Sequence, residues 1–517
     1  MELEKALCAI SCAFTLHARD TLFRFSPRLA IIELSLKSCG IRREEAPSGT
    51  LRLSCSGEVF LSRVRFLAFV VITSLLPATL RAQPIPDWLD HYREPANKLI
   101  AEALSDQSAW RRLALLTDMF GHRLSGSPQL NNAARWAAEE MKRDGLENVR
   151  LEKVMVPHWV RGRESADVIE PARHAMVMLG LGDSVGTPPD GVQADVLVVR
   201  NFADLESRAM QIRGRIVLFN APFTNYEDSR PYRSNGPSRA ARYGAVAVLV
   251  RSVGPPGLRL AHTGALQYAS DAPRIPAAAI STEDADRLQR MADRGSRIIV
   301  KLLMEAHVEP DVESANVVGE LRGRERPDEY VVVGGHLDSW DVGAGASDDG
   351  GGCVVTWEAL RLMKKLGLRP RRTVRVVLWV NEENGGRGGV AYRDAHRAEL
   401  KGHVLMLESD TGVFQPTGFG FSGTDRARDT IRAVATLLRG VGADQVGPNG
   451  GGSDIDPSVR EAGVPAMSTE VSGDYFLIHH TQADTVDKID PVDVAKNAAA
   501  IAVMAFVVAD MPQRLGE

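Results

Sequence analysis

Apolar residues in the C-terminal two hundred positions follow two alternating patterns. Continuous apolar runs, typical of buried strands, lie at 329–335, 373–380, 403–409 and 463–470. Apolar residues spaced three or four apart, typical of helices, lie at 352–367, 388–400, 426–440 and 491–511. Uninterrupted apolar strands that alternate with helices predict a mostly parallel sheet covered on both faces. We therefore predict an α/β fold, a three-layer α/β/α sandwich, whose main part is 309–517.

The segments that precede this region show two other patterns. Helical spacing of apolar residues extends over 97–145, with Gly145 where a helix would end and a polar turn at 121–130. Between 163 and 308, short β-like runs alternate with stretches rich in Pro, Gly and Asn. We predict that 83–162 begins the main domain and that 163–308 is an inserted, mostly β module. This module has no concentrated set of His, Asp and Glu, which favours a lid or substrate-positioning role over an independent enzyme.

The first 82 residues differ from the rest. An apolar run at 66–80 follows Arg63 and Arg65 and ends close to Ala82. This pattern predicts a secretory signal peptide at 63–82, cleaved after Ala82. Because signal peptides stand at the start of a chain, we expect 1–62 to be an upstream extension and translation to begin near Val64. The alternative is a membrane anchor with a cytoplasmic head, for which the run is short.

The number of cysteines bears on the location of the protein, and the net charge bears on whether it binds nucleic acid. Four of the five cysteines lie in 1–82, so Cys353 alone remains in the mature chain and no internal disulfide can form. An exported protein without disulfides fits a bacterial periplasm or exterior, and we expect a secreted or periplasmic location without stable membrane association. Cys353 opens an apolar stretch and is expected in the core. A net charge of −4 gives no electrostatic footprint for nucleic acid.

Reactive side chains follow the predicted strands directly. In parallel sheets, ligands bind at the carboxyl ends of the strands. His336 follows the first strand of the main region, Glu382 and Glu383 follow the second, and Asp410 follows the third. Asp348 follows a Gly-rich loop, and "HHTQADT" at 479–485 supplies His480. Imidazoles and carboxylates without a thiolate predict a hydrolytic zinc site, with manganese or cobalt as substitutes.

The number of these side chains favours two metal ions. One zinc takes three protein ligands and a water, so five residues with one bridging carboxylate supply three ligands to each of two ions. The cations would also hold together the carboxylates crowded beside His336, which are Asp338, Asp341, Asp348 and Asp349. Each residue alone has a simpler explanation, such as a structural His or an Asp in a turn or helix cap. Their joint occurrence after separate strands favours the metal site.

Three glycine-containing segments near the reactive residues do not carry other catalytic motifs. The glycine-rich pieces "GAGAS" at 343–347 and "GGRGG" at 385–389 do not match the GxxxxGK[ST] or GxGxxG pattern of a phosphate or dinucleotide loop. The turn "LSGSP" at 124–128 is not the GxSxG elbow of a serine hydrolase and does not follow a predicted parallel strand. The sequence therefore favours metal-dependent hydrolysis over these two classes.

Six motifs carry a specific resemblance to a known family. They are "GHRLSGSPQL", "GGHLDSWDVGAGASDDGGG", "NEENGG", "LESDTG", "GGGSD" and "HHTQADT", in this order along the chain. From about residue 95 to its end, the chain resembles the co-catalytic di-zinc exopeptidases, the family that includes plasma glutamate carboxypeptidase (carboxypeptidase Q) and bacterial leucine-type aminopeptidases. The resemblance implies the phosphorylase/hydrolase-like zinc-exopeptidase fold. It also implies that 163–308 is a protease-associated domain.

The resemblance assigns the metal ligands. It implies that His336 and Asp410 bind one zinc ion, that Glu383 and His480 bind the other, and that Asp348 bridges them. Two zinc ions per chain are therefore implied. Of the two adjacent histidines, the second fits the H-[ST]-x-x-D-T pattern of the family and the first does not.

The resemblance also assigns residues around the ligands. Glu382 is implied as the general base, and Asp338 as the carboxylate that orients His336. Tyr475 is implied as a donor to the developing oxyanion. A cis peptide bond between Asp348 and Asp349 is implied as well.

The resemblance implies a secreted exopeptidase of the carboxypeptidase Q type. Such an enzyme would act as a dipeptidase or carboxypeptidase and hydrolyse dipeptides or short peptides through a metal-bridging water. An aminopeptidase of the same family is the alternative, since the sequence leaves open which terminus is bound. A receptor-like relative without metals is less favoured because the ligands are all present, and a glutaminyl-cyclase-like acyltransferase is less favoured because of the inserted module. The turn at 123–127 and "GGGSD" at 450–454 are expected to line the pocket. The resemblance also implies a homodimer.

Overall fold

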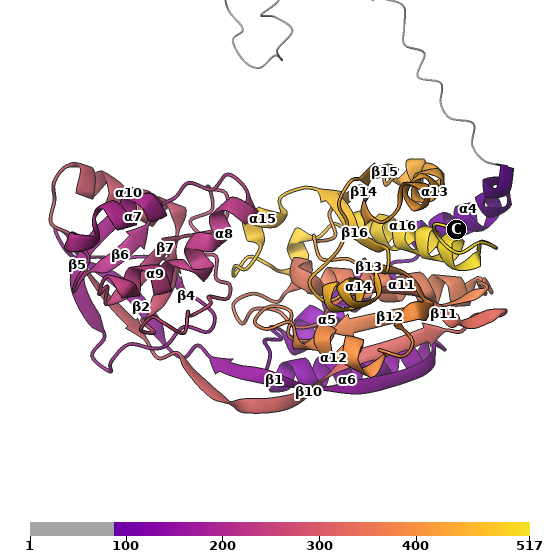
Figure 1. Ribbon diagram of the computed structural model, residues 1–517, viewed down its shortest axis with the longest axis horizontal. Helices are drawn as coiled ribbons and strands as arrows, with labels where there is room; N and C mark the ends of the chain where they lie inside the picture. Colours follow the sequence, from indigo (N-terminus) through magenta and orange to yellow (C-terminus); the bar gives the residue numbers. More distant parts are fainter. Residues whose placement is uncertain (1–86) are drawn as a thin grey trace, which may run out of the picture. The chain divides into compact units, whose positions relative to one another are not determined.

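The computed structural model describes residues 87–517 (Figure 1). The predicted upstream extension at 1–62 and signal peptide at 63–82 lie outside the described residues.

The main sheet has eight strands in the order β1-β10-β12-β11-β13-β16-β14-β15. The central strands β12, β11, β13 and β16 are parallel. The pairs β1–β10, β10–β12 and β14–β16 are antiparallel, and β15 is parallel to β14. The sequence pattern predicted the parallel centre but not these antiparallel flanks. Their bounds are β1 (Glu147–Val160), β10 (His307–Leu321), β11 (Arg326–His336), β12 (Arg372–Trp379), β13 (His403–Glu408), β14 (Gln415–Ser422), β15 (Gln445–Gly447) and β16 (Ala466–Ser472).

Helices cover both faces of this sheet, as the apolar pattern predicted. Alternate residues of β11 point to opposite sides: Val331 and Val333 join one hydrophobic cluster, and Val332 joins another. The first cluster includes helices α4 (Asp90–Ser105), α5 (Ser108–Phe120), α6 (Pro128–Arg143), α11 (Gly351–Lys365), α13 (Asp425–Ala435) and α16 (Pro491–Asp510). The second lies against α12 (Arg387–Ala395) and α14 (Asp456–Ala462). The result is the predicted three-layer α/β/α sandwich.

Helix α16 is apolar around its whole circumference. Within 87–517 it is the one helix long and apolar enough to cross a membrane, but 78% of its apolar window is buried inside the protein. It packs between α4, α11 and the sheet, so no face of it needs to be polar. The burial identifies α16 as a core helix.

A second eight-stranded sheet is formed entirely by residues 164–304, which we call the insert lobe. Its order is β3-β2-β9-β5-β6-β7-β8-β4, and β5 to β8 are parallel. The strands are β2 (Glu164–Glu170), β3 (His174–Ala175), β4 (Met178–Gly180), β5 (Val192–Val199), β6 (Ile216–Phe219), β7 (Ala247–Arg251), β8 (Ala277–Ile280) and β9 (Ile299–Met304).

The insert lobe also contains helices that the sequence pattern did not predict. They are α7 (Phe202–Ser207), α8 (Tyr226–Ser234), α9 (Gly236–Arg242) and α10 (Thr282–Asp293). Most are too short to show a clear helical period. The caps of α7 and α8, Asn201 and Asn225, belong to residue types that are equally common in loops. The lobe is therefore α/β rather than mostly β.

Strands β1 and β10 carry the chain into and out of the insert lobe. They pair along almost their whole lengths, from Glu147 opposite Glu320 to Val160 opposite His307. Figure 1 shows this long antiparallel ribbon passing from the main sheet to the lobe. The ribbon places helix α8 of the lobe opposite the carboxyl ends of the parallel strands.

We expect Ile501→Ala in α16 to lower the free energy of unfolding by about 2–5 kcal/mol, because Ile501 is fully buried and its removal leaves a cavity. Val492→Ala on the same helix is the control. Its side chain is 53% exposed, and the expected change is within about 0.5 kcal/mol. Denaturant unfolding of both variants measures the difference. Equal losses would contradict the core position of α16.

Candidate metal centre

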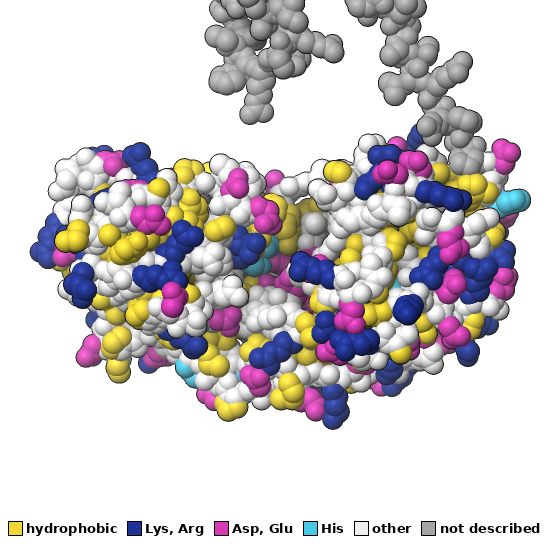
Figure 2. Space-filling view, in the orientation of Figure 1, with side chains coloured by type: hydrophobic (Ala, Val, Ile, Leu, Met, Phe, Trp, Pro, Cys, Tyr) yellow, Lys and Arg dark blue, Asp and Glu magenta, His cyan; other side chains and the backbone are white. Residues whose placement is uncertain are grey.

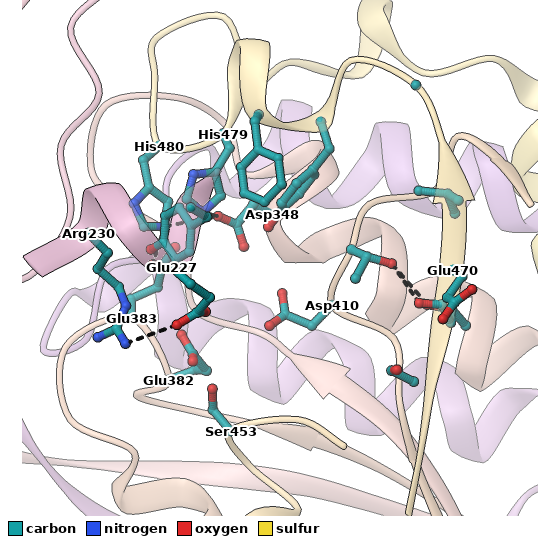
Figure 3. Close-up of a pocket in the computed structure, with 18 of the residues that line it drawn as sticks. Glu227, Arg230, Asp348, Glu382, Glu383, Asp410, Ser453, Glu470, His479 and His480 are labelled. Carbon is teal, nitrogen blue, oxygen red and sulfur yellow. Dashed lines mark hydrogen bonds and ion pairs between the residues drawn. The ribbon is translucent and has the colours of Figure 1, made fainter. Parts of the chain in front are cut away.

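A cavity of about 880 Å³ lies between the main sheet and the insert lobe. Helix α8 of the lobe lines one side, and the loops after β12, β13 and β16 line the other. Figure 2 shows the hollow between the two parts, with acidic, basic and His side chains visible in it. Figure 3 shows Asp348, Glu382, Glu383 and Asp410 pointing into the same space.

Three predicted ligands meet on one side of this centre. His336 ends β11, is 1% exposed, and its Nε2 lies 3.2 Å from Asp348 Oδ1. The same Nε2 lies 3.2 Å from Oδ1 of Asp410, which follows β13. The three ligand atoms lie within 4.8 Å of one another, close enough to bind one metal ion.

The other predicted ligands meet on the opposite side of Asp348. His480 Nε2 lies 3.2 Å from Asp348 Oδ2 and 3.0 Å from Glu383 Oε2. Asp348 therefore presents one carboxylate oxygen to each imidazole. This is the geometry required of a bridging carboxylate.

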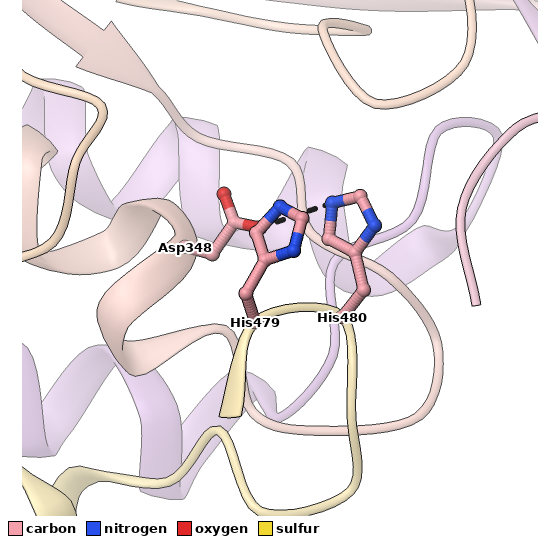
Figure 4. Close-up of side chains that lie close together, drawn as sticks. All are labelled: Asp348, His479 and His480. Carbon is pink, nitrogen blue, oxygen red and sulfur yellow. Dashed lines mark ion pairs between the residues drawn. The ribbon is translucent and has the colours of Figure 1, made fainter. Parts of the chain in front are cut away.

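His479 lies closer to the centre than the sequence indicated. Its Nε2 is 3.5 Å from Asp348 Oδ2, and its ring stacks on that of His480 with centroids 3.6 Å apart (Figure 4). Asp348, His479 and His480 also satisfy the geometry of a metal-binding group. The additional contact of His480 with Glu383 favours His480 as the ligand, and His479 is a second candidate.

Burial dominates the electrostatics of the cluster. Burial raises the pKa of Glu383 to about 8 and that of Asp410 to about 6, with the charge of Asp348 adding to both. Burial alone would lower the pKa of His336 and His480, but the surrounding carboxylates raise both well above the ordinary value. So much buried negative charge requires a compensating positive charge.

The donor set fits zinc. Asp348 Oδ2 is buried and makes no hydrogen bond within residues 87–517, although two imidazole nitrogens point towards it. A buried carboxylate oxygen normally has a hydrogen-bond donor or a metal ion. Two imidazoles and three carboxylates suit zinc.

The loop before α11 is held by two further carboxylates. The predicted cis peptide bond between Asp348 and Asp349 is present. Asp349 accepts hydrogen bonds of 3.0 Å from the N–H groups of His336 and Gly352, so its carboxylate faces the main chain. It therefore ties the end of β11 to the start of α11.

Asp484 was not singled out by the sequence reasoning, although it is the Asp of the H-[ST]-x-x-D-T pattern. Its carboxylate accepts hydrogen bonds from the N–H groups of Ser347 at 2.6 Å and Asp348 at 3.0 Å. Burial and the charge of Asp348 raise the pKa of Asp484 to about 7. Asp484 thus fixes the main chain of Asp348 from the loop that carries His480.

The contact between Asp338 and His336 differs from the one predicted. The carboxylate of Asp338 lies 3.9 Å from His336 Nδ1, whereas its main-chain carbonyl lies 3.0 Å from that nitrogen and orients the ring. The carboxylate accepts hydrogen bonds from the N–H groups of Glu382 at 3.2 Å and Glu383 at 3.3 Å instead. Asp338 therefore links the loops after β11 and β12.

Asp341 is neutralised by a side chain. Arg161 donates two hydrogen bonds to its carboxylate, of 2.8 and 2.6 Å. The expectation that metal ions hold all the carboxylates of this segment is therefore wrong for Asp341. Arg161 directly follows β1, and nothing in the local sequence indicated the contact.

The turn at 123–127 does not line the cavity, contrary to expectation. Arg123 is fully buried and donates to the main-chain carbonyls of Leu337 at 2.7 Å, Ala344 at 2.7 Å and Gly345 at 2.9 Å. It braces the loop between His336 and Asp348. The motif "GGGSD" at 450–454 was also expected to line the cavity, and its Ser453 does so.

Glu382 and Tyr475 both line the cavity beside the predicted metal ligands. Glu382 is half-buried and follows Asn381, which has a left-handed backbone with φ of +68°. The Asn381 side chain donates hydrogen bonds to Ser125 at 3.1 Å and Asn384 at 2.8 Å, which stabilise this turn. Burial raises the pKa of the Tyr475 hydroxyl well above its ordinary value, so Tyr475 stays a proton donor.

Comparisons with known proteins agree with this chemistry. The model of peptidase family M28 matches residues 316–505. Carboxypeptidase Q of Mus musculus is 45% identical over 435 residues, which cover 83% of this chain and 92% of that protein.

Two solved peptidase structures resemble the structure of this chain. A peptidase M28 precursor from Shewanella amazonensis superposes with a TM-score of 0.80 and 34% identity, over 83% of this chain and 99% of that one. A zinc aminopeptidase from Bacillus subtilis, 19% identical, shares the fold with a TM-score of 0.58 over 79% of this chain and 96% of that one.

We expect Asp484→Asn to weaken zinc binding about 10- to 100-fold, because an amide offers one acceptor oxygen where two main-chain donors converge. Asp487→Asn is the control, since the side chain of Asp487 is 68% exposed and its carboxylate accepts hydrogen bonds from the side chains of Thr485 and Lys488. Zinc competition with a chelator measures both variants. Unchanged affinity in Asp484→Asn would show that the Asp348 loop does not depend on this carboxylate.

Proposed function

This chain belongs to peptidase family M28, and we propose that it hydrolyses dipeptides and other short peptides at a centre of two zinc ions. Zinc-dependent exopeptidase activity is the function of the chain, since it covers 92% of a carboxypeptidase Q at 45% identity. The two-ion centre rests on the position of Asp348, which presents one oxygen towards His336 and the other towards His480.

The ligand assignment follows from these contacts. His336 and Asp410 would hold one ion, Glu383 and His480 the other, with Asp348 between them. Two zinc ions there would lower the pKa of a shared water and polarise the scissile carbonyl group.

Glu382 and Tyr475 supply the remaining chemistry. The Glu382 carboxylate, held by the Asp338 contact to its main chain, takes a proton from the attacking water and delivers it to the leaving amine. The Tyr475 hydroxyl donates a hydrogen bond to the substrate carbonyl oxygen as negative charge develops on it.

Charges around the cavity favour recognition of a free substrate carboxylate. Two arginines line the cavity. Arg233 is buried, and its guanidinium donates hydrogen bonds to other groups of the protein. Arg230 is 45% exposed and forms an ion pair of 3.5 Å with Glu227, which also lines the cavity (Figure 3). Arg230 therefore has donors available for the carboxylate of the last residue. The aminopeptidase alternative is supported by Glu470, which lines the cavity and offers a carboxylate to a free amine.

The remaining features of the proposal rest on sequence. Residues 83–162 and 309–517 form the peptidase domain, and 163–308 is a protease-associated domain inserted into it. The signal peptide at 63–82 directs export to a secreted or periplasmic location. Homodimer formation is part of the same proposal.

We expect Glu382→Gln to keep both zinc ions and to lose turnover by at least about 100-fold, because the amide cannot accept the proton. Zinc analysis and hydrolysis of unblocked dipeptides measure the two properties separately. Asp394→Asn, an exposed change on α12, is the control and should retain full activity. Full turnover in Glu382→Gln would assign the base to another residue.

We expect Arg230→Gln to raise KM about 10-fold or more for unblocked dipeptides, with little change for their C-terminal amides, because only the former present a carboxylate to Arg230. Arg239→Gln on α9, outside the cavity, should leave both KM values unchanged. N-acetylated dipeptides complete the substrate set. If the wild type cleaves the C-terminal amides but not the N-acetylated dipeptides, the aminopeptidase alternative is correct.

A further inference from the structure

One short segment of the insert lobe, 262–264, contacts His480 of the candidate metal centre through its main chain. The main-chain N–H of Thr263 donates a hydrogen bond of 3.0 Å to the carbonyl of His480. In the other direction, His480 Nδ1 lies 3.3 Å from the carbonyl oxygen of Thr263. The two residues are 217 positions apart in the sequence, so this two-point contact exists only in the folded protein.

This contact determines which nitrogen of His480 faces the metal centre. When Nδ1 carries the proton and donates it to Thr263, Nε2 keeps its lone pair and points at Asp348 and Glu383. The main chain of His480 is left-handed, with φ of +60°, which a residue with a β-carbon adopts only under constraint. The N–H of Thr263 supplies part of that constraint.

Arg233 of helix α8 holds the other side of this segment. Its Nη1 donates to the Thr263 carbonyl at 3.1 Å, and its Nη2 donates to the Tyr226 hydroxyl at 2.7 Å. Nη1 also lies 3.4 Å from His480 Nδ1. Because a carbonyl oxygen has two lone pairs, it can accept from both Arg233 and His480.

The side chain of Arg233 is buried in the wall of the cavity. Arg233 is only 4% exposed. The φ of Gly264 is +130°, which favours glycine, and a β-carbon there would lie 2.3 Å from Arg233 Nη1, so any other residue would displace the guanidinium. The guanidinium lies directly over the main chain of the segment that contacts His480.

The segment is also tied to the loop after β11. The Thr263 hydroxyl donates to the Gly180 carbonyl at 2.7 Å, and Arg161 Nη1 donates to the same carbonyl at 2.6 Å. Arg161 in turn holds Asp341 through two hydrogen bonds. Segment 262–264 is thus held by Arg233 on one side and, through Gly180 and Arg161, is linked to the loop that contains Asp341 on the other.

We propose that Arg233 is a positioning residue for the metal centre: by holding the Thr263 carbonyl, it fixes the ring of His480 and completes the half of the centre formed by His480 and Glu383. The inference rests on the proposed two-ion function. It gives the insert lobe a direct part in metal binding, in addition to its contribution to the cavity wall.

Zinc binding by Arg233→Met tests this proposal. The full-length mature protein is freed of metal and titrated with zinc against a competing chelator. We expect two zinc ions on the wild type, and in Arg233→Met one ion of unchanged affinity and one weakened about 10- to 100-fold. Substitution with Co²⁺ gives a second readout, since the visible absorption of the weakened site should change while that of the other site stays.

Arg233→Lys and Arg239→Met are the matched variants. Lysine can donate to the Thr263 carbonyl but not also to Tyr226, so Arg233→Lys should recover part of the lost affinity. Arg239 lies on α9 outside the cavity, and Arg239→Met should bind both ions as the wild type does. Added zinc should restore kcat in Arg233→Met with little change in KM, which a loss of substrate binding would not do.

Each result decides the proposal. Two ions bound with wild-type affinity by Arg233→Met overturn it. If that variant does not fold, as judged by circular dichroism, Arg233→Lys and Tyr226→Phe replace it, and wild-type zinc affinity in both overturns the proposal. A wild-type protein that binds fewer than two zinc ions would instead overturn the two-ion function itself, so the two failures are distinguishable.

Discussion

The structure depends on one constraint: several carboxylates lie buried around Asp348 with too little positive charge from side chains to balance them. Burial raises the pKa of Glu383 and Asp410, and the neighbouring carboxylates raise those of the two imidazoles. Without cations, such a cluster would either take up protons or destabilise the fold. Zinc resolves this conflict, and the same charge that would destabilise the empty centre provides its affinity.

The surrounding chain is organised to keep the carboxylates in place. Asp338, Asp349 and Asp484 each accept hydrogen bonds from main-chain N–H groups rather than facing the metal centre. Arg123 does the converse, donating to main-chain carbonyls of the loop that leads to Asp348. Because these contacts are charge-assisted and buried, they fix the loops far more firmly than loop sequence alone could.

The insert lobe takes part in the same organisation. Helix α8 places Tyr226, Arg230 and Arg233 on one side, four and three residues apart, so that they face the cavity together. Tyr226 stacks on Phe476 beside His479, and Arg233 reaches the segment that contacts His480. The residues proposed for substrate recognition and for positioning of the metal centre therefore lie on one helix.

The sequence by itself determined the three-layer fold and the chemistry of the site, because apolar periods define strands and helices and because reactive residues at parallel strand ends converge. It also indicated the five candidate ligands and the candidate base Glu382. Only the tertiary structure decided that Asp348 lies between two imidazoles, that Asp341 pairs with Arg161, and that Thr263 contacts His480. These contacts join residues far apart in the chain, and no local pattern specifies which distant partner a buried polar group will find.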